Sequence, residues 1–156
     1  MTSQTMVATS RRRVRRNTAE AINQRVDDQI ERNIRFFSVH RDRIERRLTE
    51  LDEEWDIERM IEANAAALAF GGTILGLTRG YRFLVLPLAV TAFLFQHAVQ
   101  GWCPPIPILR RLGFRTADEI NRERYALKAL RGDFDALADK KTPTPSANAA
   151  IKAVNA

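Results

Sequence analysis

Two side chains near position 100, Cys103 and His97, are of types that perform chemistry. Cys103 is the only cysteine in 156 residues, which excludes an intrachain disulfide and any multi-cysteine zinc site. Arg110 and Arg111 follow it closely, and nearby cations favour the thiolate that a catalytic or redox thiol needs. No CxxC pair and no partner base accompany it, so chemistry alone favours a small buried residue, and the reactive thiol stays open as the alternative.

The remaining sequence offers no stronger catalytic constellation. His97 lies 6 positions before Cys103, and prolines follow the cysteine, so the two do not share a helical face and make a poor metal site. The chain contains no glycine-rich phosphate loop, no nucleophile elbow and no HExxH motif. We therefore expect no metal, no cofactor and no enzymatic activity, with Cys103 as the one weak candidate for a catalytic residue.

The elements that must position Cys103 are two charge-free stretches, residues 64–78 and 83–102. The second has 20 residues and would rise about 30 Å as a helix, which is roughly the thickness of the hydrocarbon core of a bilayer. The first reaches a similar length when it is extended back to Met60. Both stretches are apolar on every face, which indicates burial on every side. Pro87 is expected to kink the second helix.

The turn between these stretches is short, so the two helices must run antiparallel. The sequence thus predicts an all-α membrane protein built on an antiparallel two-helix transmembrane hairpin, with amphipathic helical arms on both sides. No Gly or Pro occurs before Gly71, and apolar residues recur every three or four positions from Ile22 to Phe37. Breaks are expected near Ser38 and in the LDEEWD segment, where Asp56 can cap the next helix.

The predicted domain organisation has five parts. They are a disordered basic N-terminus over 1–16, an amphipathic helical arm over 17–55, the transmembrane hairpin with its Cys-Pro exit over 56–114, an amphipathic interfacial helix over 115–135, and a disordered tail over 136–156.

Small residues form a stripe along the first span that predicts close helix packing. The predicted helix-packing positions are Ala65, Ala69, Gly72, Gly76 and Gly80. Spacings of three and four residues place them on one face, where another backbone can approach closely. The neighbouring helix can be the second half of the same hairpin or a helix of another copy. Because two spans alone bury little surface, we expect a homo-oligomer, of which a dimer is the simplest form.

Charged and aromatic residues mark the expected membrane interfaces, at Arg79, Arg82, Trp102, Arg110 and Arg111. Seven arginines flank the outer ends of the two spans and two lie in the turn, which favours both termini in the cytoplasm of a bacterial cell with the hairpin in its inner membrane. The basic RRRVRR segment has no interleaved aromatic residue, so membrane lipid headgroups are the expected partner and nucleic acid is not. The sequence indicates no particular protein partner.

The stretch WDIERMIEANAAALAFGGTILG, followed by a hairpin and by QGWCPPIPILRRLGF, resembles the YgaP-like transmembrane domain. This is a family of inner-membrane domains of unknown function, and the resemblance covers roughly residues 56–114. It rests on Glu58-Arg59, Gly71 or Gly72, the exit Gly101-Trp102-Cys103-Pro104, and Gly113. Some relatives carry this hairpin beside a rhodanese sulfurtransferase domain, which this chain lacks, and are thought to dimerise through it.

Two functions follow as expectations. The first is a small integral inner-membrane protein that acts as a self-associating scaffold or interaction module. The second, which the resemblance strengthens, is a sulfur-handling or redox accessory that uses the thiol of Cys103.

Overall fold

The computed structural model describes residues 13–135 of the chain, and the parts of the predicted disordered ends at 1–12 and 136–156 lie outside the described residues. The described residues fold into helices without strands, as the sequence predicts. In chain order the helices are α1 (Arg13–Arg16), α2 (Glu20–Val39), η1 (Arg41–Arg43), α3 (Ile44–Glu53), α4 (Ile57–Arg79), η2 (Tyr81–Leu84), α5 (Val85–Gln100), α6 (Ile106–Arg111) and α7 (Ala117–Arg131). They form two compact units, and α2 and α7 each pass from one unit into the other.

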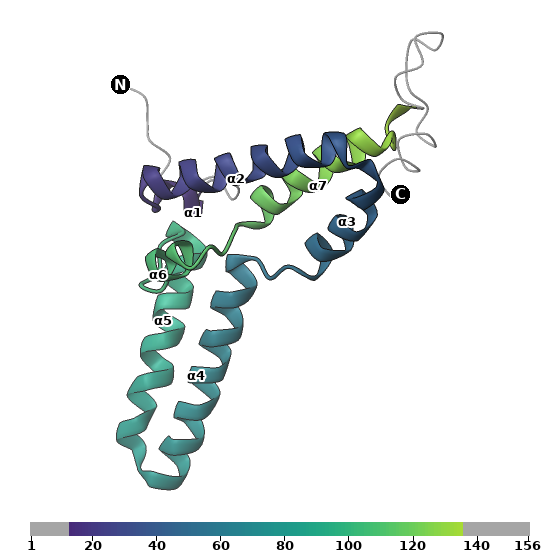
Figure 1. The fold of residues 1–156 in the computed structure, drawn as a ribbon. Helices are drawn as coiled ribbons and strands as arrows, with labels where there is room; N and C mark the ends of the chain where they lie inside the picture. Colours follow the sequence, from purple (N-terminus) through teal and green to yellow (C-terminus); the bar gives the residue numbers. More distant parts are fainter. Residues whose placement is uncertain (1–12, 136–156) are drawn as a thin grey trace, which may run out of the picture. The chain divides into compact units, whose positions relative to one another are not determined.

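The first unit, which comprises the described residues 13–27 and 55–118, is built around two long antiparallel helices. Helices α4 and α5 lie side by side and are joined by the short 3-10 turn η2 (Figure 1). The carboxylate of Asp56 accepts a hydrogen bond from the backbone N–H of Arg59 at 2.7 Å, which confirms the predicted N-terminal cap of α4. At the far end Gly80 adopts φ of 129°, a backbone conformation that glycine reaches without strain.

The predicted kink at Pro87 is wrong, because the helix begins later than the apolar stretch does. Residues Tyr81–Leu84 form the 3-10 turn and α5 starts at Val85, so Pro87 falls in the first turn of α5. A proline is tolerated there because the N–H that it lacks has no obligatory partner within the helix.

The two ends of the hairpin meet. The backbone N–H of Ile57, where α4 begins, donates to the carbonyl oxygen of Arg115 at 2.9 Å. Helix α6 starts at Ile106 with Pro107 in its first turn, where a proline is tolerated. Apolar side chains close this end of the unit in one buried cluster, formed by Val14, Ile57, Ile61, Cys103 and Ile106.

The expected disorder of the N-terminus is wrong for its last four residues. Residues Arg13–Arg16 form the helical turn α1. The physical reason is Val14, the one apolar residue among these arginines, which is buried in the cluster with Ile57 and Ile106. A single apolar side chain in a basic segment gives no periodic signal, so the sequence pattern did not reveal this contact.

The second unit, which comprises the described residues 28–54 and 119–135, packs parts of α2 and α7 with α3. The chain breaks between α2 and α3 at His40 and again at 54–56, close to the predicted positions. The buried core consists of Phe37, Ile44, Leu48, Leu51, Ile120 and Leu127, with Leu130 against it. Other helices of the unit thus cover the apolar stripe of α7, and the interfacial role of residues 115–135 stays a prediction.

A buried carboxylate also ties this unit together. Glu123 on α7 is fully buried and accepts hydrogen bonds from Arg47 Nε at 2.8 Å and from Asn33 Nδ2 at 3.0 Å. Arg47 in turn reaches the more exposed Glu50 at 3.1 Å. Because a buried charge without partners is costly, these hydrogen bonds make the position of α7 on α2 and α3 specific.

We expect Glu123→Ala to destabilise the second unit by on the order of 3 kcal/mol, because it leaves the largely buried Arg47 with one partner fewer. Glu50→Ala is the matched control, since this half-exposed carboxylate binds the same arginine, and its effect should stay below about 1 kcal/mol. Hydrogen–deuterium exchange of the amides of α3 and α7 measures both effects. Equal exchange rates in the two variants would contradict the role of Glu123.

Candidate functional site

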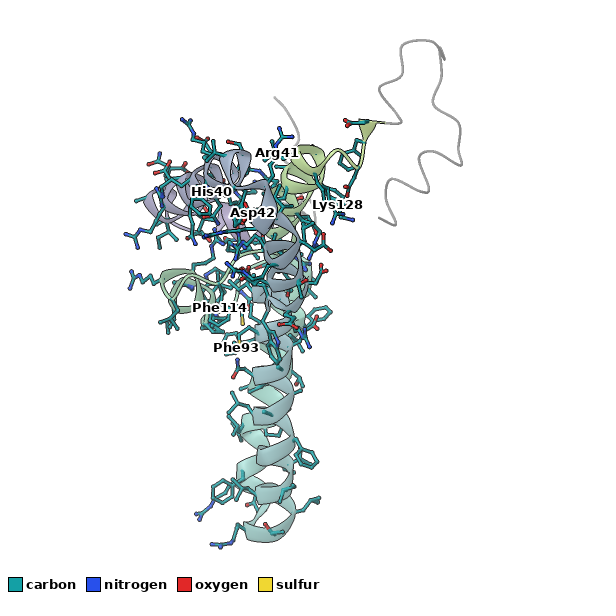
Figure 2. The ribbon with its side chains drawn as sticks, turned by 45° about the vertical axis from the view of Figure 1, so that its right-hand side comes forward. His40, Arg41, Asp42, Phe93, Phe114 and Lys128 are labelled. Carbon is teal, nitrogen blue, oxygen red and sulfur yellow. The ribbon has the colours of Figure 1, made fainter. Side chains whose placement is uncertain are left out.

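The outer surface of the hairpin is apolar on both helices. The most exposed large apolar side chains on α4 and α5 are Phe70 at 70%, Leu77 at 80%, Leu88 at 71% and Phe95 at 72%. Along the hairpin in Figure 2 the side chains are mostly carbon, with nitrogen-tipped side chains at its turn. Two helical stretches, Arg41–Arg79 and Tyr81–Gln100, are each long and apolar enough to cross a membrane. Few residues of their apolar parts are buried within the protein.

Four polar side chains on these helices bond to the helix that carries them. The hydroxyls of Thr73, Thr78 and Thr91 each donate to the carbonyl oxygen four residues earlier at 2.8 Å. The amide of Asn64 donates to the carbonyl oxygen of Met60 at 2.8 Å. These groups therefore need no water as a partner, which is the condition for placing them in hydrocarbon.

The predicted stripe of small residues packs against the second helix of the same hairpin at Gly72 and Gly76. A Cβ added to Gly72 would lie 2.7 Å from Cδ of Pro87, and one added to Gly76 would lie 2.3 Å from Cδ2 of Leu84. Both glycines are buried, and Ala65 and Ala69 are half-buried. Gly80 belongs to the turn, and a Cβ there would meet nothing within 4 Å. The small residues at 72 and 76 thus let α4 approach α5 closely.

We expect Gly72→Ala to lower the stability of the hairpin by about 1–3 kcal/mol, because the rigid Pro87 ring cannot move aside for the added methyl group. Gly71→Ala is the matched control, since a Cβ at position 71 meets nothing within 4 Å. Alanine should be neutral or favourable at position 71, because it is the better helix former. The midpoint of thermal unfolding in detergent measures both variants, and equal midpoints would contradict the packing role of Gly72.

The residues predicted at the membrane interfaces lie in different surroundings. Arg79, Arg82 and Arg111 are exposed, and Trp102 is half-buried. The prediction of an interface position is corrected for Arg110, because only 1% of this residue is exposed. Its guanidinium donates to Asn23 Oδ1 at 3.1 Å and to the carbonyl oxygen of Phe114 at 3.2 Å. Those partners come from separate segments, and neighbouring Arg111 carries the same charge, so the sequence could not distinguish the buried arginine from the exposed one.

Helix α1 covers the end of α5, a contact that sequence reasoning missed. Arg13 Nη1 donates to the carbonyl oxygen of Ala98 at 3.3 Å, and Asn17 Nδ2 donates to that of Gly101 at 3.3 Å. These donors satisfy carbonyls that the last turn of a helix leaves without partners. Gly101 has φ of 74°, and a Cβ there would lie 2.3 Å from the Arg13 side chain, so a larger residue would displace α1.

His97 lies in the last turn of α5, close to these contacts, and does not form a shared site with the thiol of Cys103. Its ring is buried, and neither ring nitrogen has a hydrogen-bond partner among the described residues. Among residues 13–135, no group of three or more His, Cys, Asp or Glu side chains is arranged to hold a metal ion.

Cys103 lies at the exit of the hairpin, buried to 5% exposure. It lines a cavity of about 400 Å³ together with residues of α4, α5, α6 and the segment between α5 and α6, namely Ile61, Asn64, Ala65, Leu68, Val90, Phe93, Leu94, Pro104, Pro105 and Leu109. Burial in this apolar lining raises the pKa of the Cys103 thiol, because desolvation disfavours the thiolate. This agrees with the small buried residue that the sequence favours over a reactive thiol, and of the two arginines that follow, Arg110 donates to Asn23 and Arg111 is exposed.

We expect Cys103 to react with maleimide slowly at pH 7, and its rate to go on rising with pH beyond the ordinary thiol pKa of about 8.5 before it levels off. The slow reaction at neutral pH follows from the raised pKa of the thiol. The thiolate is the reacting species, and a raised pKa reduces its fraction at pH 7. Rates measured across a pH series on folded and on denatured protein give the comparison. An apparent pKa below that of the denatured chain would contradict a buried, inactive thiol.

Comparison of the chain with protein-family models, with curated proteins and with solved structures found no match in any of the three.

Proposed function

We propose that this chain is a small integral membrane protein whose hairpin α4–α5 anchors a charged helical unit to the bacterial inner membrane, where that unit acts as a scaffold or interaction module. The observation that carries the proposal is the apolar outer surface of both hairpin helices. A helix of a water-soluble domain shows a polar stripe toward solvent, and these two helices lack one along their length. Lipid is the solvent that such a surface fits.

The proposed orientation places both termini in the cytoplasm. Its support is the distribution of arginines, which are more numerous beside the outer ends of the two spans than in the turn with Arg79 and Arg82. The interaction role is supported by the charged outer faces of α2 and α3. Their exposed side chains include Arg25, Asp28, Arg32, Arg35, Glu45 and Arg46, and they offer both signs of charge to a soluble partner.

We further propose a relation to the YgaP-like transmembrane domain, supported by the Gly101-Trp102-Cys103-Pro104 exit. Self-association, a dimer being the simplest case, is part of the same proposal. Its support is the apolar helix surface that a single hairpin leaves uncovered. The outer faces are the surfaces available for it, because Gly72 and Gly76 already pack against α5.

The alternative, a sulfur-handling or redox accessory, depends on Cys103. Burial of the thiol and its raised pKa favour the scaffold over this alternative. Cys103→Ser separates the two, because a scaffold keeps its function with serine at this position and a thiol carrier loses it.

The membrane proposal is tested by alkaline carbonate extraction of bacterial membranes, from which the full chain should stay in the pellet. Orientation is tested in a Cys103→Ser background with single cysteines introduced by Tyr81→Cys in the turn or Ser38→Cys in α2. We expect a membrane-impermeant maleimide to label spheroplasts at position 81 before lysis and at position 38 only after lysis. Release by carbonate would refute the membrane anchor, and the reverse labelling order would refute the orientation.

A further inference from the structure

We propose that the cavity lined by Cys103 is a binding site for one acyl chain of a membrane phospholipid. The inference rests on the proposed membrane function, because it takes its occupant from the surrounding bilayer. Three observations carry it, namely the composition of the lining, the position of the opening and the extent of the cavity along α4.

The lining fits a hydrocarbon chain. Apart from the thiol of Cys103 and the amide of Asn64, every side chain that lines the cavity is apolar. The Asn64 amide donates to its own helix, so the lining does not demand a polar ligand. A volume of about 400 Å³ lies within the usual range of small-molecule sites, and an apolar cavity of this kind does not hold water well.

The cavity is continuous with the surface that faces lipid. Leu68 on α4 and Phe93 on α5 both line the cavity, and both are also among the exposed large apolar side chains of the hairpin. Figure 2 shows Phe93 on the part of the hairpin remote from the turn. A chain lying against the outer face can therefore pass between these two side chains without crossing a polar surface.

The extent of the cavity along α4 fits within one leaflet. Along α4 the lining runs from Ile61 to Leu68, which is about 10 Å of helix, and one leaflet of hydrocarbon is about 15 Å thick. Pro104 and Pro105 lie at the other end, in the exit segment that leads to α6. The headgroup is thus placed beside the exit segment, and the chain runs from there toward Leu68 and Val90 in the middle of the bilayer.

The test uses the full chain in vesicles of phosphatidylethanolamine and phosphatidylglycerol that contain a phospholipid with a photoreactive diazirine on its acyl chain. After illumination, mass spectrometry maps the labelled residues. Wild type should carry label on the cavity lining and on the outer face near Phe70 and Leu88. Ala65→Phe should lose the cavity label and keep the outer label, because the added ring fills the site.

Ala67→Phe is the matched control, since this alanine on the same helix is exposed and does not line the cavity. Val90→Phe fills the site from α5 and should give the same loss as Ala65→Phe, so a folding defect of one variant does not decide the outcome. Equal cavity label in the Ala65, Val90 and Ala67 variants would overturn the inference. So would a wild-type chain labelled only on its outer face. A hairpin without any label would overturn the membrane function itself.

Discussion

Two helices that pack together can cover only the stripe of each that faces the other. In this chain that stripe is narrow, because Gly72 and Gly76 bring α4 against Leu84 and Pro87, and the large apolar side chains are left on the outside. The rest of the structure depends on this constraint. The hydroxyls of Thr73, Thr78 and Thr91 bond to the hairpin helices that carry them, and the buried charges Arg110 and Glu123 lie on α6 and α7 rather than on α4 or α5.

The buried charges explain how helices with so many ionisable residues keep a defined arrangement. Glu123 holds Arg47 and Asn33 in the second unit, and Arg110 holds Asn23 in the first. Each of these groups would be costly to bury alone, so a misplaced helix leaves at least one charge without a partner. The apolar clusters supply most of the burial, and the charged contacts determine which helix packs where.

Sequence reasoning identified what local pattern and composition control. The all-helical fold, the two long apolar helices, the turn between them, the Asp56 cap and the breaks near residues 40 and 55 all follow from periodicity and from turn or capping residues. It failed where a side chain finds a partner far away in the chain. Arg110 and Arg111 are chemically identical neighbours, yet only one meets Asn23, and Val14 gains order only because Ile57 and Ile106 surround it. Cys103 shows the same limit, since the burial that raises its pKa comes from three separate helices.

The hydrogen bond between Ile57 and Arg115 closes the hairpin and its exit into a loop whose two ends are neighbours. A segment with adjacent ends can be inserted into a host chain, or removed from one, without stretching the host between the two junctions. The hairpin that we propose as a membrane anchor is therefore portable in a geometric sense, because a different soluble domain can carry it wherever two backbone positions lie one hydrogen bond apart. Such an insertion imposes one condition on the host, which is that both junctions lie on the same side of the bilayer.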